Sequence, residues 1–244
     1  MPDLGFGVRV IGRASRKRRA AFEGEALAIP VRTRLVRRGD DLAALIASAV
    51  AGIGRSGDVI CVSETAVAIA QGRMISAETI RPSRLAYALS RYAGPMATVN
   101  QPESLQLVID QVGAWRVACA AVAQAGGRLI GRRGVFYEIL GGAISTIDGY
   151  TGTLPPFERT IVLGPADPDR VAREIAALTG SYAAIVDVND LGIAKVLGAS
   201  SGVARSAVES ALLENPHGNG DEQTPIVALK WRGRGANPFL ESAA

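Results

Sequence analysis

Two short runs of uninterrupted apolar residues constrain the fold most tightly. They are Val59 to Val62, within Asp58-Val59-Ile60-Cys61-Val62-Ser63, and Ala183 to Val186, within Ala183-Ala184-Ile185-Val186-Asp187. Neither alternates between apolar and polar positions, which is typical of a strand buried on both faces. The second run also delivers an acid at its C-terminal end. With 244 residues, 48% of them hydrophobic, the chain can bury a core, and this composition excludes an intrinsically disordered protein.

The remaining apolar patterns predict further helices and strands. Leu42 to Ile53 has helical spacing after Asp40, which is placed to cap that helix. Other helices are expected over 66–70, 82–91, 102–126, 168–179 and 203–214, with Pro102 in a first turn and Gly180 as a stop. Within the longest of these, Cys119 and Val122 are expected on the apolar face. Strands are expected over 29–31, 35–36, 135–140, 160–163 and 225–231. Helices and strands mixed without strict alternation favour an α+β or irregular α/β fold.

The positive charge is concentrated near the N-terminus. The net charge is +4, and five of the basic residues are Arg13, Arg16, Lys17, Arg18 and Arg19. Such a run is most often a solvated arm, and it lacks the interleaved aromatic residues that stack on bases, which argues against nucleic acid as a partner. We therefore expect an arm over 1–25, a main domain over 26–235 that is either one body or two interleaved lobes, and a tail over 236–244.

The cysteine and histidine content limits the kinds of catalytic and metal site that the chain can form. Cys61 and Cys119 are isolated in apolar runs and are expected to be packing residues in a reducing compartment. His217 is the single histidine, so most familiar hydrolase and zinc sites are disfavoured, and a solvated loop position is expected for it. The longest apolar run is interrupted by Arg116, so no membrane span is predicted, and a cytoplasmic location is expected.

Three polar loops collect acids where neither core nor helix requires them. They span residues 146–156 with Asp148, residues 185–192 with Asp187 and Asp190, and residues 215–225 with Glu222 and Gln223. Turn chemistry alone explains many such residues. If the loops converge, however, their oxygens suit Mg²⁺ or Mn²⁺. Arg132 and Arg133, before the strand expected at Val135, are either phosphate-facing cations or surface charge. Neither a Walker-type loop nor a G-x-G-x-x-G turn is present.

At these residues the chain resembles the glutamate ligases of coenzyme F-420 biosynthesis. The resemblance runs from about Ala26 to Trp231 and is clearest in the four segments Ile29-Pro30-Val31, Arg38-Gly39-Asp40-Asp41-Leu42, Gly57 to Ser63, and Ala70-Gln71-Gly72-Arg73. Asp148 with the following Leu154-Pro155-Pro156, the strand ending at Asp187 and the loop from Gly218 to Pro225 follow in the family's order. The resemblance implies a two-lobed, mixed-sheet α+β ligase fold and a homodimer.

The resemblance also implies the reaction. It is amide ligation through an acyl phosphate, in which GTP or ATP and a divalent metal serve to attach L-glutamate to a small cofactor-like acceptor. It assigns Asp148 and Asp187 as catalytic metal ligands. We expect Glu222 or Gln223 to complete the shell, and the polar loops add Asp190 as a further candidate ligand. Nucleotide contacts are expected from Pro30, Val31, Arg32, Arg34, the Gly39 region, Ser63, Glu64, Arg132, Gly218 and Gly220.

The sequence departs from the family pattern at several positions. Ile69 stands where the family usually has a nucleotide-facing Lys, Gly149-Tyr150-Thr151 intervenes after Asp148, and Val188 follows Asp187 in place of Thr. These departures describe a divergent branch. Two alternatives therefore stay open: a glutamate ligase acting on a folate- or pterin-like acceptor, and a non-catalytic nucleotide- or cofactor-binding protein.

Overall fold

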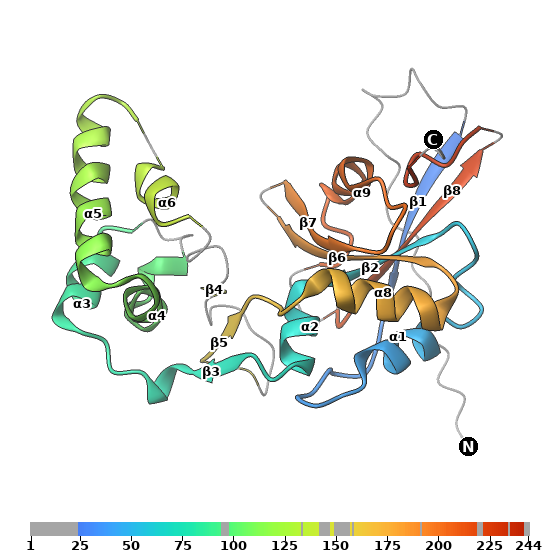
Figure 1. Ribbon diagram of the computed structural model, residues 1–244, viewed down its shortest axis with the longest axis horizontal. Coiled ribbons are helices and arrows are strands. Elements are labelled where there is room, and N and C mark those ends of the chain that lie inside the picture. The colour runs from blue at the N-terminus through green and yellow to red at the C-terminus, as the bar shows by residue number, and fades with distance from the viewer. Residues whose placement is uncertain are drawn as a thin grey trace. The chain divides into compact units, whose positions relative to one another are not determined.

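The chain forms two compact units. The computed structural model describes residues 24–93, 98–132, 134–141, 147–148, 157, 159–190, 192–218, 222–233 and 235–241. Unit 1 comprises residues 1–72 and 165–244, and unit 2 comprises residues 73–164 (Figure 1). Unit 2 is therefore inserted into unit 1 along the chain. The basic residues between Arg13 and Arg19 lie outside the described residues.

Unit 1 is built on a five-stranded mixed sheet in the order β1-β8-β2-β6-β7. The strands are β1 (Gly24–Val31), β2 (Val59–Ser63), β6 (Tyr182–Asn189), β7 (Ile193–Ala199) and β8 (Ile226–Gly233). β2 and β6 run parallel, whereas the other neighbours are antiparallel. The two strands predicted to be buried on both faces are thus paired near the centre of the sheet. The α+β prediction is confirmed.

Helices cover both faces of this sheet, which explains the apolar runs. α1 (Leu42–Val50) and α8 (Pro168–Thr179) lie on one face and α9 (Arg205–Leu212) on the other (Figure 1). Val59 and Cys61 of β2 pack with Val208 and Leu212 of α9 in one core cluster. Since every residue from Val59 to Val62 has no exposed surface, successive side chains of β2 are buried on alternate faces.

Local sequence fixes where these helices begin and end. The Asp167 carboxylate accepts from the backbone N–H of Arg170 at the start of α8, Pro168 fills the first turn, and Gly180 ends the helix with a φ of 66°. At α1 the predicted cap is wrong by one residue. Asp41, not Asp40, accepts from Ala44 N–H, because Asp40 is bonded to the Arg34 guanidinium and to Arg37 N–H.

β7 has no counterpart among the predicted strands, and it depends on a close backbone approach. A Cβ atom on Gly198 would lie 2.3 Å from the carbonyl carbon of Pro168, so only glycine lets β7 pass the start of α8. The Asp169 carboxylate then joins three elements, because it accepts from Ala199 N–H at 2.8 Å and from Arg205 at 2.7 Å. The N–H of Ala199 and the Arg205 guanidinium hold the pKa of Asp169 below its usual value.

Unit 2 combines a small sheet with helices. The sheet has the order β3-β5-β4, with β3 (Met74–Ser76), β4 (Ile147–Asp148) and β5 (Thr160–Leu163). The helices are α3 (Arg84–Ser90), α4 (Pro102–Val112), α5 (Ala114–Leu129) and α6 (Val135–Leu140). Its core is apolar and includes Leu105, Val108, Val117 and Ile161.

Three predictions in unit 2 are wrong. The single long helix expected from Pro102 is two helices, α4 and α5, because Gly113 adopts a φ of 90° and the axes bend by 115°. The bend resets the helical phase, so Cys119 is exposed and Val122 is 74% exposed instead of facing the core. The strand expected at Val135–Leu140 is α6; six residues between Gly134 and Gly141, all apolar or aromatic except Glu138, fit either structure by pattern alone.

None of the described helices is by itself long and apolar enough to cross a membrane. α4 and α5 meet the length and composition test only when taken together, across their bend at Gly113.

A buried ion pair ties the start of β2 to β8, and we expect its loss to destabilise unit 1. Lys230 Nζ lies 2.5 Å from Asp58 Oδ2, and the two side chains are 13% and 11% exposed. Lys230→Met leaves the carboxylate buried without its cation, so the free energy of unfolding in urea should fall by about 3 kcal/mol. Adding Asp58→Asn should recover part of that loss. A change below about 0.5 kcal/mol in the single variant would show that the pair contributes little.

Candidate functional site

One end of the five-stranded sheet collects most of the predicted site residues. In the strand registers, Ile226 faces both Val31 and Val62, and Ser63 faces Val186, the residue before Asp187. The C-terminal ends of β1, β2 and β6 and the start of β8 therefore lie side by side. We call this end the site edge; it comprises residues 30–33, 63–64, 187–190, 215–218 and 222–226. Of the predicted site residues it includes Pro30, Val31, Arg32, Ser63, Glu64, Asp187, Asp190, Gly218, Glu222 and Gln223.

Backbone and side-chain hydrogen bonds fasten the loop before β8 to its neighbours. Asn215 Nδ2 donates to the Asp190 carboxylate at 2.6 Å, which links the loop to the turn after β6. The carbonyl of Gln223 accepts from Thr33 N–H at 3.1 Å, and the carbonyl of Pro225 accepts from Ser63 N–H at 2.9 Å. Residues that are far apart in sequence are thus held at one edge by bonds between loop and strands.

Asp187 is a half-buried carboxylate whose negative charge is only weakly balanced by its neighbours. Burial raises its pKa, because a charge in a poorly solvated position is disfavoured. Lys195, its register partner on β7, acts in the opposite sense but is itself exposed. A carboxylate held in this way favours a cation beside it.

His217 is buried, which corrects the expectation of a solvated loop histidine. Its side chain is 8% exposed, Nδ1 lies 3.1 Å from the carbonyl of Thr224, and the Thr224 hydroxyl donates to the carbonyl of His217. Burial lowers the pKa of His217 to about 4, so the ring is neutral. Because a carbonyl only accepts, Nδ1 carries the proton, and Nε2 has a lone pair with no partner among the described residues.

Gly218 allows Glu222 to approach the loop backbone. Its φ is 74°, and a Cβ atom there would lie 2.7 Å from the Glu222 carboxyl carbon. Gln223 also has a positive φ of 54°, which is uncommon for a residue other than glycine. The loop is therefore held in an unusual conformation at the point where it delivers two oxygen-bearing side chains.

Arg32 and Arg34, the two arginines predicted near the nucleotide, differ in whether a carboxylate already pairs with them. Arg34 donates to Asp40 at 2.6 Å, and this bond is the main reason that the pKa of Asp40 is lowered. Arg32 is exposed and forms no ion pair with any described residue. Arg32 is thus the better placed of the two to meet an anion.

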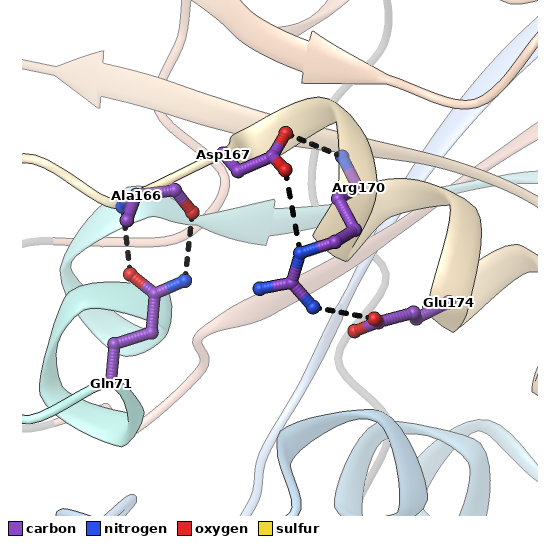
Figure 2. Close-up of polar contacts among 5 residues, drawn as sticks. All are labelled: Gln71, Ala166, Asp167, Arg170 and Glu174. Atoms are coloured by element: carbon purple, nitrogen blue, oxygen red, sulfur yellow. Dashed lines mark hydrogen bonds and ion pairs between the residues drawn. The ribbon is translucent and has the colours of Figure 1, made fainter.

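The Ala70-Gln71-Gly72-Arg73 motif is used partly for structure. Figure 2 shows both ends of the Gln71 amide bonded to the backbone of Ala166, with distances of 2.8 Å and 2.7 Å. Asp167, Arg170 and Glu174 form a surface ion-pair series just beyond. Ile69, at the position where the family usually has Lys, is 8% exposed in α2 (Glu64–Ala70) and belongs to the core.

The remaining predicted residues lie elsewhere. Asp148 is in β4 of unit 2, where its backbone pairs with Val162. Arg132 is also in unit 2 and forms an exposed ion pair with Glu138 at 3.1 Å. Gly220, Arg133 and Leu154-Pro155-Pro156 lie outside the described residues. Among the side chains that are described, no three His, Cys, Asp or Glu residues are grouped closely enough to hold a metal ion.

Comparison with known proteins identifies the family. The model of the family "F420-0:Gamma-glutamyl ligase" matches residues 30–212. The chain belongs to this family. This confirms the resemblance found in the sequence. A coenzyme F420:L-glutamate ligase of Methanopyrus kandleri is 33% identical over 142 residues, which cover 58% of this chain. The match spans only 48% of that relative's length.

We expect His217 to make stability fall at mildly acidic pH. The unfolded histidine takes up a proton near pH 6.5, whereas the folded one does so only near pH 4. The stability it contributes is complete above about 6.5 and is lost as the pH falls towards 4. Between pH 7 and pH 5 the loss should be about 2 kcal/mol. Urea unfolding at several pH values should show a shallower pH dependence in His217→Gln; equal slopes would contradict the assignment.

Proposed function

We propose that this protein is a nucleotide- and metal-dependent ligase that joins L-glutamate to a carboxylate of a small cofactor-like acceptor. The observation that supports this most directly is the site edge. It brings together segments that carry many of the predicted site residues, including Arg32, Ser63, Asp187 and the loop before β8. Ligands of α/β sheets commonly bind beyond the carboxyl ends of parallel strands, and β2 and β6 both end here.

The site edge suits the phosphates of GTP or ATP. Arg32 is an exposed cation without a described carboxylate partner. Because Ile69 is in the core where the family usually has Lys, Arg32 takes on a larger share of phosphate binding in this chain.

The site edge offers the kinds of oxygen ligand that Mg²⁺ or Mn²⁺ binds, although no three of the described acids are grouped closely enough to hold an ion. Asp187, Asp190, Glu222 and Gln223 offer carboxylate and amide oxygens, which these ions prefer. The raised pKa of Asp187 indicates a carboxylate whose charge the fold alone leaves poorly balanced. When bound, such an ion would neutralise phosphate charge. The role predicted for Asp148 stays a prediction.

The proposed chemistry has two steps. The acceptor carboxylate attacks the γ-phosphorus of the nucleotide, so that an acyl phosphate forms and the nucleoside diphosphate leaves. The amine of glutamate then attacks the acyl carbon, an amide bond forms, and inorganic phosphate leaves. The residues of the site edge mainly have to position the reactants and stabilise the charge that develops on oxygen.

Binding and product formation test the proposal separately. Calorimetry with GTP and with ATP, each with and without Mn²⁺, should show metal-dependent binding of one nucleotide. Mass spectrometry after incubation with glutamate and a panel of carboxylate acceptors should show a mass increase of one glutamyl residue. Sedimentation velocity of the same sample tests whether the ligase is a homodimer. Binding without any glutamylated product from the panel would favour the non-catalytic alternative.

Asp187→Asn should abolish turnover without harming the fold. Glutamate-dependent release of phosphate should fall roughly hundredfold or more, because the variant lacks the negative charge that binds the cation. Burial raises the pKa of Asp187, so its ionised form costs stability at pH 7 and that cost disappears as the pH falls through the folded pKa. The variant should therefore melt at the same or a higher temperature at pH 7, and its advantage should shrink in acid.

Glu174→Gln is the matched control for Asp187→Asn, because Glu174 is an exposed acid whose partner is Arg170. It should retain full turnover. Retained turnover in Asp187→Asn would show that Asp187 is not needed for the reaction.

Arg32→Ala should weaken nucleotide binding selectively. The KM for the nucleotide should rise roughly tenfold with little change in kcat, since a charge-assisted contact to phosphate is lost. Arg232→Ala is the control: Arg232 is also exposed, but it lies six residues along β8 from Ile226, about 20 Å from the site edge. An equal rise of KM in both variants would point to a general effect of charge and contradict the specific role of Arg32.

A further inference from the structure

One side of α5 exposes an apolar stripe to solvent. Residues three and four apart share one side of a helix, and on α5 six exposed residues follow this spacing. We call them the α5 stripe: Trp115, Cys119, Val122, Ala125, Gly126 and Leu129. Trp115, Val122 and Leu129 are 81%, 74% and 89% exposed, and none of the six is charged. Exposed apolar patches larger than about a few hundred Å² usually mark interaction sites.

The opposite side of α5 is fixed against unit 2, which holds the stripe outside. α5 packs against α4 and α6 (Figure 1). Val117 and Ala120 belong to the core of unit 2. A Cβ atom on Gly127 would lie 2.9 Å from the side chain of Val135 in α6, so the two helices approach closely there. The helix cannot turn its stripe inward without losing these contacts, and the exposure of the stripe is therefore a fixed property of the unit.

The charges around the stripe are all positive. Between Asp110 and Glu138 the sequence has no acid and four arginines, which are Arg116, Arg128, Arg132 and Arg133. Helical spacing places Arg116 and Arg128 on opposite borders of the stripe. Each of these two donates to a backbone carbonyl, and neither has an ion-pair partner among the described residues. Arg132 forms the exposed pair with Glu138. The stripe is thus an apolar strip between two uncompensated cations.

An anionic lipid surface is the partner that fits both features. Arginine keeps its guanidinium at the headgroups while its stem lies along apolar surface, and tryptophan is favoured where a membrane meets water. A second copy of the chain would bring two sets of four arginines together, and like charges disfavour such an interface. Nucleic acid would need aromatic residues to stack on its bases, whereas Trp115 is the single aromatic residue of the stripe.

We propose that the α5 stripe is a docking surface for a membrane that contains anionic lipid. Trp115, Val122 and Leu129 enter the boundary between headgroups and acyl chains, with α5 lying in the plane of that boundary. Arg116 and Arg128 bind the lipid phosphates. Because the other side of α5 packs on the core of unit 2, the helix lies on the membrane and does not cross it. This surface belongs to unit 2 alone and does not depend on the ligase reaction.

Vesicles of two compositions test the proposal on the full chain. Vesicles of equal parts phosphatidylcholine and phosphatidylglycerol should bind it roughly tenfold or more tighter than pure phosphatidylcholine, and high salt should weaken the binding. Replacing both Arg116 and Arg128 by Gln should lower the affinity for the anionic vesicles roughly tenfold. In Trp231→Phe, Trp115 is the one remaining tryptophan, so its emission should shift to shorter wavelength when anionic vesicles are added.

A matched pair of variants decides whether the stripe itself binds. Leu129→Glu, at an 89% exposed position, should fold and should abolish vesicle binding, whereas Leu178→Glu, at a 59% exposed position of α8 in unit 1, should leave it unchanged. Both variants keep the N-terminal arginines and change the net charge equally.

Binding that persists in Leu129→Glu, equal affinity of the wild type for the two kinds of vesicle, or an unshifted Trp115 emission would overturn the proposal. A lower sedimentation coefficient of Leu129→Glu without vesicles would also overturn it, because the stripe would then be a contact between two copies. None of these outcomes bears on the Asp187 and Arg32 tests of the ligase.

Discussion

The parallel pairing of β2 with β6 is the constraint on which unit 1 depends. Both strands are buried on both faces, so they need α9 on one side and α1 and α8 on the other. Because β2 and β6 run in the same direction, both end at the same edge, and the antiparallel β8 must begin there. Five loops or strand ends therefore converge at the site edge. The position of the candidate site is a consequence of the strand directions, and the polar residues occupy an edge that the core already defines.

Unit 2 is inserted in the connection between the parallel strands β2 and β6. The chain leaves unit 1 after α2, which follows β2, and returns just before α8, which precedes β6. The connection between the two parallel strands is thus long enough to hold a whole second unit. Hydrogen bonds within each unit hold the two chain segments that cross between the units. In unit 1 the Gln71 side chain bonds to the backbone of Ala166, and in unit 2 the Arg73 side chain donates to the carbonyl of Gly164. These bonds account for the side chain of Gln71 in a motif that otherwise suggests nucleotide binding.

The sequence predicts what depends on local pattern and misses what depends on distant contacts. β2, β6 and α8 could be predicted because apolar runs, Asp167, Pro168 and Gly180 specify them locally. α6 could not be told from a strand, since a hexapeptide between glycines has no period of its own. β7 is defined by its pairing with β6 and by the contact of Gly198 with Pro168, and neither leaves a periodic signal. In the site, the acids could be named from the sequence, but the burial of His217 follows from the fold of its loop against Thr224.

The two ends of the same sheet satisfy their charges in opposite ways. At the start of β2, Asp58 and Lys230 are both buried and satisfy each other, and Asp58 also accepts from Arg55 N–H, so this end is complete as folded. At the site edge, burial raises the pKa of Asp187, His217 Nε2 has no described partner, and Arg32 has no described counter-ion. Buried polar groups are normally paired, and leaving them unpaired costs stability. Of the three groups at the site edge, only His217 is buried without a described partner for Nε2, whereas Asp187 is half-buried opposite Lys195 and Arg32 is exposed to solvent. A carboxylate, a lone pair and a cation are the groups that our proposal assigns to a metal, a hydrogen-bond donor and a phosphate, and the strand directions bring the segments that carry them to one edge.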